Sequence, residues 1–302
     1  MLHLLYAALC LVVLIKSADI FVDQSLSVAK KLKVSSFLIG FTLIFLGTAL
    51  PDIVISTFAS AQGNSEFAIS TFLGSTIVNV TLLVGVLSFF TKYKLDKSDI
   101  SKNIPITLGA SIFLLILILL FRFNFTWIAG IITMTIYTIT VFFAKQNNTT
   151  TIRHKTVTFN IIAFLISFIL LIVTGKISTD QFLLFADHYK IADSVIGFFL
   201  VGIGITIPEL VASLEVIKKG NLQLSLGNIL GATLINILFI PGLGSFFNTL
   251  NFQPFLPSVL FVIFGLIIFF FLALLGKEYY ITKKEGCVMV LIYILFVISQ
   301  FL

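Results

Sequence analysis

Residues 47–52 read GTALPD and lie inside a long apolar run, and residues 204–209 read GITIPE inside another. These two stretches are 157 residues apart. The same spacing relates residues 74–79, which read GSTIVN, to residues 231–236, which read GATLIN. Apolar similarity alone would not align glycine, proline, asparagine and acidic residues without a gap. The spacing therefore indicates an internal repeat, a feature of many membrane transporters.

The composition predicts a protein that is solvated by lipid. Of the 302 residues, 59% are hydrophobic and only 11% are charged, whereas a soluble domain has about 25% charged residues. Several apolar runs reach the roughly 20 residues that a helix needs to span a bilayer. They are too continuous for barrel strands, which alternate every second residue. We therefore expect an all-α, polytopic integral membrane protein.

The apolar runs and the charged segments between them predict ten transmembrane helices. The first half, residues 1–144, and the second half, residues 157–302, would each hold five helices, joined by a linker at residues 145–156. Because five is odd, the second half would enter the bilayer from the opposite side, as an inverted repeat. The expected helices lie near residues 2–29, 35–61, 66–90, 103–121, 125–144, 157–185, 193–217, 222–246, 254–275 and 281–301.

The basic residues predict an orientation. Fifteen of the 19 Lys and Arg residues fall in alternate loops of the ten-helix arrangement. Positive loops remain cytoplasmic, so we expect a cytoplasmic linker and both termini outside, and the composition fits a prokaryotic inner membrane. The net charge of +6 does not indicate a nucleic-acid partner, because the basic residues occupy short loops between apolar runs. Nothing in the sequence indicates an oligomeric state.

Two carboxylates lie in the middle of apolar runs, at Asp52 and Glu209. A charged side chain at the bilayer centre costs at least about 2.5–3.5 kcal/mol. Each follows a proline, Pro51 or Pro208, and a proline within a helix removes one amide donor and frees a carbonyl. We therefore expect a helix break beside each carboxylate, with the freed carbonyls available to a cation.

Oxygen-bearing side chains surround both carboxylates in the sequence. Hard divalent cations take six to eight oxygen ligands, and two carboxylates would neutralise Ca²⁺. No His or Cys joins the motifs, so zinc or copper is not expected. For the glycines of the motifs, helix packing and direct function both remain open. The predicted cation site comprises Thr48, Asp52, Ser75, Asn79, Thr206, Glu209 and Asn236.

The two motif pairs resemble the signature repeats of the sodium/calcium exchanger family, among the calcium/cation antiporters, and particularly its compact prokaryotic members. The family pattern is close to G-T-S-L-P-E followed by G-N/S-x-x-G-S-x-x-x-N/D, and the resemblance covers nearly the whole chain. It implies ten helices in inverted halves and cation binding between the second, third, seventh and eighth helices, at the seven residues named above. It also implies exchange of Ca²⁺ for Na⁺ by alternating access, with the first and sixth helices sliding, and no cofactor.

The chain departs from that pattern at five positions. Asp52 replaces a glutamate, Ala49 and Ala232 replace serines, Ile205 replaces a threonine, and Asn236 stands where several members have aspartate. The second half therefore loses two hydroxyl groups whose first-half counterparts are kept. If several sodium ions share these ligands, at least one sodium position is weakened.

These departures leave alternatives to sodium coupling. A proton-coupled Ca²⁺ exchanger needs only the carboxylates, and a degenerate, non-transporting paralogue is a second alternative. A membrane-embedded hydrolase with Asp52 and Glu209 as an acid pair is a third, although no nucleophile or metal-binding histidine set accompanies them. We expect a transporter and not an enzyme.

Overall fold

The computed structural model describes residues 2–31, 45–90, 93–95, 99–144, 160–218, 222–275 and 279–301. The linker expected at residues 145–156 lies outside these residues, as do the first parts of the helices expected at residues 35–61 and 157–185.

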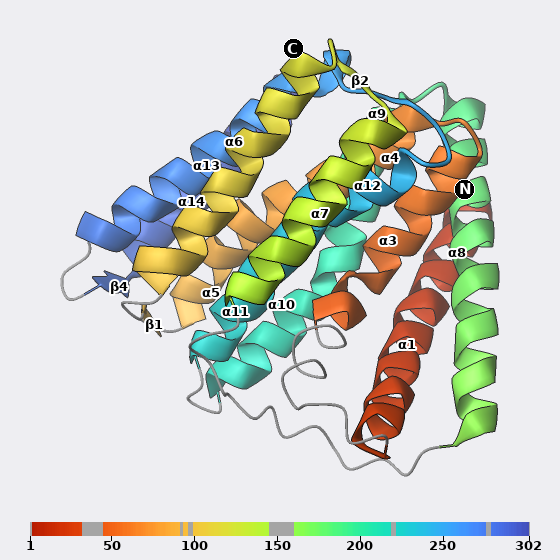
Figure 1. Cartoon of the computed structure of the whole chain (residues 1–302), viewed down its shortest axis with the longest axis horizontal. Helices are drawn as coiled ribbons and strands as arrows, with labels where there is room; N and C mark the ends of the chain where they lie inside the picture. The colour runs from red at the N-terminus through yellow and green to blue at the C-terminus, as the bar shows by residue number, and fades with distance from the viewer. Residues whose placement is uncertain are drawn as a thin grey trace.

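The described residues are mostly helical, which confirms the predicted class (Figure 1). The first half contains α1 (Leu2–Lys31), α3 (Phe45–Ala61), α4 (Ser65–Ile77), η2 (Val78–Leu83), α5 (Val84–Phe90), η3 (Asp99–Asn103), α6 (Ile104–Leu120) and α7 (Trp127–Ala144). The second half contains α8 (Ile161–Tyr189), α9 (Asp193–Val195), η4 (Ile196–Val201), α10 (Gly202–Lys218), α11 (Leu222–Leu234), η5 (Ile235–Phe239), α12 (Ile240–Gly244), η6 (Gln253–Phe255), α13 (Leu256–Leu275) and α14 (Lys283–Ser299). All η segments are π-helical except η6, which is a 3₁₀ turn.

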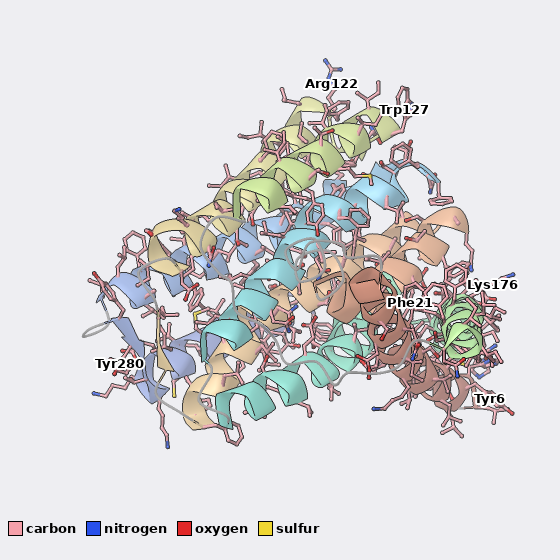
Figure 2. The ribbon with its side chains drawn as sticks, turned by 60° about the horizontal axis from the view of Figure 1, so that its bottom comes forward. Tyr6, Phe21, Arg122, Trp127, Lys176 and Tyr280 are labelled. Carbon is pink, nitrogen blue, oxygen red and sulfur yellow. The ribbon has the colours of Figure 1, made fainter. Side chains whose placement is uncertain are left out.

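Within the described part of the chain, seven helical stretches are long and apolar enough to cross a bilayer. Ala49–Ala61 and Trp127–Val141 are shorter apolar helices. Large apolar side chains are exposed along the outside of the bundle, as on α8, and Figure 2 shows Tyr6 and Trp127 at its periphery. Such a surface suits lipid, so the chain is an integral membrane protein. The seven stretches are Leu2–Phe21, Ser65–Phe90, Asp99–Leu120, Ile161–Tyr189, Asp193–Val211, Leu226–Gly244 and Gln253–Leu275.

The elements recur along the chain at the spacing of the sequence motifs. Helices α4 and α11 end 157 residues apart, at Ile77 and Leu234, and each continues into a π-helical segment, η2 or η5. Two short antiparallel strand pairs join the halves: β1 (Tyr93–Lys94) pairs with β4 (Tyr280–Ile281), and β2 (Asn124–Phe125) pairs with β3 (Leu250–Asn251). Each pair thus takes one strand from each half.

Helices α1 and α8 pack together along their length at one side of the bundle (Figure 1). Stacked rings of Phe21 and Phe164, with centroids 5.0 Å apart, lie between them, and the Ser178 hydroxyl donates to the Ala7 carbonyl at 3.3 Å. The remaining helices surround α3, α4, α10 and α11, which pack against one another and carry the sequence motifs. The polar centre of the protein is therefore enclosed by helices that face lipid.

Candidate cation site

Small residues let the site helices approach closely. A Cβ atom at Gly74 of α4 would lie 2.8 Å from the Phe198 Cα in η4, and one at Gly202 of α10 would lie 2.9 Å from the Gly74 carbonyl carbon. No side chain fits between these backbones, and small residues are the usual means of such close helix crossings in membranes. Packing is therefore one role of the motif glycine at residue 74. The crossing also brings the Ser75 backbone against α10, because a Cβ atom at Gly202 would lie 3.0 Å from the Ser75 nitrogen.

The two carboxylates lie together in the interior. Asp52 is 0% exposed and Glu209 is 2% exposed, and Glu209 lies close enough to Asp52 to feel its charge. Ser75 and Asn236 are electrostatic neighbours of Asp52, and Asn79 is a neighbour of Glu209. The structure thus brings together five of the predicted site residues from four helices.

The carboxylate oxygens lack partners. None of the four carboxylate oxygens of Asp52 and Glu209 has a hydrogen-bond partner among the described residues. A buried charged group that lacks a partner costs several kcal/mol, so such atoms are rare in a folded protein. A hard cation, which prefers oxygen ligands, would satisfy all four carboxylate oxygens at once.

The two asparagines lie on irregular turns. Asn79 is in the π-helical segment η2 and Asn236 in η5, and both are fully buried. The Asn236 Nδ2 atom donates to Ser75 Oγ at 2.8 Å, which leaves Asn236 Oδ1 without a partner in the described part of the chain. Neither polar side-chain atom of Asn79 has one there. π-helical turns are frequent at functional sites. We infer that these two segments orient the Asn79 and Asn236 amides toward the carboxylates of Glu209 and Asp52.

The two threonines of the predicted site lie on the helices that carry the carboxylates. Thr206 is 2% exposed and its hydroxyl donates to carbonyls of its own helix, at 2.9 Å to Ile203 and 3.1 Å to Gly202. Thr206 lies on α10, the helix that carries Glu209. Thr48 belongs to α3, but its side chain lies outside the described residues.

The prediction of a helix break beside each carboxylate is wrong. Helix α3 runs without interruption through Pro51, and α10 does so through Pro208. A proline removes one hydrogen bond, but packing from neighbouring helices keeps such a membrane helix continuous. Irregular backbone instead falls at η2 and η5, on the partner helices, and at η4, which ends directly before α10.

Two hydroxyl groups near the site were missed by the sequence analysis. Ser56 and Ser213 are 1% and 2% exposed, and neither Oγ atom has a hydrogen-bond partner among the described residues. Each follows a carboxylate by four residues, and the two are related by the 157-residue spacing. That spacing was the signal that could have found them.

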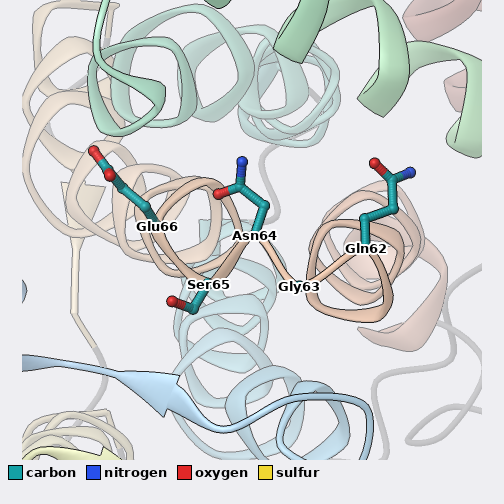
Figure 3. A pocket seen from close by; sticks show the side chains of 5 residues that line it. All are labelled: Gln62, Gly63, Asn64, Ser65 and Glu66. Carbon is teal, nitrogen blue, oxygen red and sulfur yellow. The ribbon is translucent and has the colours of Figure 1, made fainter.

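A polar hollow lies at the turn between α3 and α4 (Figure 3). It is lined by Gln62, Gly63, Asn64, Ser65 and Glu66. Side chains of this turn tie it to the second half of the chain. Gln62 Nε2 donates to an Asp180 carboxylate oxygen of α8 at 2.7 Å, and Asn64 Nδ2 donates to an Asp193 carboxylate oxygen at 2.7 Å.

The profile of the family described as "Sodium/calcium exchanger protein" matches residues 2–146 and 159–302. The chain belongs to this family. The exchanger is 29% identical over 300 residues to the uncharacterized membrane protein MJ0091 of Methanocaldococcus jannaschii, a match that covers 97% of this chain and 96% of that one. It is 26% identical to the sodium/calcium exchanger MaX1 of Methanosarcina acetivorans, with 99% and 98% covered.

Solved structures agree with this assignment. The exchanger resembles the sodium–calcium exchanger NCX_Mj soaked with 100 mM Na⁺ and 10 mM Sr²⁺, with a TM-score of 0.69, 28% identity and coverage of 99% of this chain and 98% of that one. It resembles NCX_Mj soaked without Na⁺ and Ca²⁺ with a TM-score of 0.67 and 27% identity. The family resemblance noted from the motifs is confirmed. Members of this family are transporters that exchange Ca²⁺ and other cations, so the exchanger is not an enzyme and the hydrolase alternative is wrong.

Proposed function

We propose that this exchanger moves Ca²⁺ across the membrane against Na⁺, at a site formed by Thr48, Asp52, Ser75, Asn79, Thr206, Glu209 and Asn236. The observation that carries the proposal is the pair of buried carboxylates, Asp52 and Glu209, whose oxygens have no partner among the described residues. Two such charges balance one Ca²⁺, and the neighbouring amide and hydroxyl oxygens suit a hard cation. The names of MaX1 and NCX_Mj, as sodium/calcium exchangers, support the choice of ions.

The two ions would compete for the same carboxylates. Cations on Asp52 and Glu209 offset the repulsion between these charges, so the loaded site can be enclosed by protein at lower cost. Either Ca²⁺ or the counter-ion does this, but the site cannot hold both. Competition of this kind makes transport an exchange.

Proton coupling is the second candidate. Ala232 is fully buried and has no hydroxyl, and Asn79 has no partner for its amide among the described residues. A sodium position that depended on a hydroxyl at residue 232 would be weakened, whereas protons need only a carboxylate. This observation favours a reduced sodium stoichiometry or proton coupling over a loss of calcium binding.

For the topology, we propose ten transmembrane helices in two inverted five-helix halves, residues 1–144 and 157–302, with a cytoplasmic linker at residues 145–156. The spacing of 157 residues between the motifs on α3 and α10, and between the ends of α4 and α11, supports the repeat. Asn64, just after α3, contacts Asp193 at the beginning of the α9–α10 stretch, and this contact supports opposite directions for the two repeat-related helices. Both termini lie toward the same side in Figure 1, and the basic loops put that side outside a prokaryotic inner membrane.

Alternating access would come from α1 and α8, which pack on each other at the edge of the bundle. Sliding of this pair along α3 and its neighbours would open the site to one side and then to the other. Inverted repeats commonly work by rocking or sliding one group of helices against another around a fixed site.

Uptake of ⁴⁵Ca²⁺ into proteoliposomes tests the proposal. Vesicles are loaded with Na⁺ or acidified inside, and the wild type is compared with Asp52→Asn and Glu209→Gln. We expect uptake driven by the sodium gradient that both substitutions abolish. Uptake driven by the proton gradient alone would assign the exchanger to proton coupling. No Ca²⁺ uptake under either gradient would overturn the calcium assignment.

A further inference from the structure

Ser56 on α3 and Ser213 on α10 lack the hydrogen bond that most buried hydroxyl groups of the bundle make. The buried Oγ1 atoms of Thr57 and Thr126 also lack a partner among the described residues, but only Ser56 and Ser213 are related by the 157-residue spacing and follow a carboxylate by four residues. Buried serines and threonines here usually donate to a carbonyl of their own helix, as Thr71 does to Phe67 at 2.8 Å and Thr76 to Phe72 at 2.6 Å. Ser56 and Ser213 are 1% and 2% exposed, yet neither hydroxyl oxygen has a partner in the described part of the chain. A buried hydroxyl with no partner costs about 1–3 kcal/mol, so these two indicate a ligand.

Both serines lie beside the carboxylates. Ser56 follows Asp52 by four residues and Ser213 follows Glu209 by four residues, so each pair shares one face of a continuous helix. Four residues of α-helix rise about 6 Å. Each hydroxyl therefore lies one helical turn beyond its carboxylate, on the helix face directed toward the site.

The two serines lie on opposite sides of the site. The end of α3 lies against the beginning of the α9–α10 stretch, because Asn64 donates to Asp193. Ser56 lies between Asp52 and that end of the helix pair, whereas Ser213 lies between Glu209 and the opposite end. The two hydroxyls thus lie beyond the carboxylates toward opposite ends of the helix pair.

We propose that Ser56 and Ser213 are relay ligands, each of which holds a hard cation or a water of its hydration shell one turn before it reaches the carboxylates. A hydroxyl oxygen at this point replaces a water ligand while the ion is only partly dehydrated, as oxygen ligands do for Ca²⁺. This inference rests on the proposed function. It adds one further ligand, Ser56 or Ser213, for each membrane face.

The test is the KM for Ca²⁺ at each membrane face, measured in vesicle populations of opposite orientation. The variants are Ser56→Ala, Ser213→Ala and Ser60→Ala. Ser60 is the matched control, since it is equally buried on α3 but its hydroxyl donates to the Ser56 carbonyl at 2.9 Å. We expect Ser56→Ala to raise the KM roughly fivefold, the loss of one hydrogen bond, only at the face where Asn64 lies.

Ser213→Ala should have the same effect at the other face only, and Ser60→Ala should change neither. Neither alanine variant should lower the melting temperature of the ion-free protein, because the hydroxyl it removes has no partner. Ser56→Thr and Ser213→Thr, which keep the hydroxyl, should restore the wild-type KM. If Ser56→Ala and Ser213→Ala have the same KM for Ca²⁺ as Ser60→Ala at both faces, the inference is overturned while the proposed function stands. A wild type without Ca²⁺ uptake would overturn both.

Discussion

Asn236 donates a hydrogen bond from Nδ2 to Ser75 Oγ at 2.8 Å, and this bond joins the two halves of the exchanger inside the site. The 157-residue spacing relates Asn236 to Asn79 and Ser75 to Ala232. The counterpart bond therefore cannot form, since alanine has no hydroxyl. Asn79 is left without a partner for its amide nitrogen among the described residues. The asymmetry of the sequence thus becomes an asymmetry of hydrogen bonding around the two carboxylates.

Ala232→Ser should restore the missing bond. We expect the half-saturating Na⁺ concentration for Ca²⁺ uptake to fall several-fold, because the new hydroxyl both holds Asn79 and offers a sodium ligand. The ion-free protein should gain about 1 kcal/mol of stability, the usual net value of one hydrogen bond. Ala232→Cys, similar in volume but a poor oxygen substitute, is the control. An unchanged Na⁺ dependence in the serine variant would show that residue 232 does not limit sodium coupling.

Calcium should stabilise the wild type, since it satisfies the oxygens of Asp52 and Glu209. At 100 times the dissociation constant the gain is about 2.7 kcal/mol, and a thermal melt in detergent measures it. Asp52→Asn should lose this shift but melt a few degrees higher than the wild type in a chelator, because one buried charge is removed. Asp19→Asn is the control, since Asp19 is exposed and pairs only loosely with Lys16 at 3.9 Å. A variant that keeps the full calcium shift would argue against Asp52 as a ligand.

Gly202→Ala should destabilise the exchanger. Its Cβ atom would lie 2.9 Å from the Gly74 carbonyl carbon and 3.0 Å from the Ser75 nitrogen, and neither backbone can move aside cheaply. Overpacking of this kind costs about 1–3 kcal/mol, which thermal melting and expression yield would report. Gly109→Ala, in the interior of α6 with nothing within 4 Å of the new atom, should be neutral or slightly stabilising. Equal melting temperatures for the two variants would refute the close crossing.

A cross-link between Gln62 and Asp180 should stop transport. These side chains are hydrogen bonded at 2.7 Å and join α8 to the turn after α3. The experiment uses Gln62→Cys with Asp180→Cys, in a chain whose Cys10 and Cys287 are replaced by serine. A short, reducible bifunctional thiol reagent should block Ca²⁺ uptake, and a reductant should restore it, because sliding of α8 past α3 is prevented.

The single-cysteine variants treated with the same reagent are the control and should keep transporting. Full transport by the cross-linked double variant would rule out sliding of α8 along α3.

The sequence alone determined the class of this protein and the identity of its central residues. Hydropathy and run length predicted membrane helices, and the helix expected at residues 103–121 agrees with α6, Ile104–Leu120. The repeated motifs pointed to Asp52 and Glu209, because a carboxylate in an apolar run is costly wherever the run folds. These inferences depend on composition, charge and spacing, which are properties of the chain itself.

Only the tertiary structure decided how those residues meet. It placed the irregular turns at Asn79 and Asn236, kept α3 continuous through Pro51, and joined Asn236 to Ser75. These features depend on distances between helices that are far apart in sequence. A helix interrupted by proline is stable or broken according to its neighbours, and a side chain turns toward whichever partner packing brings within about 3 Å. No pattern along one segment contains that information, so the contacts of the site had to come from the folded molecule.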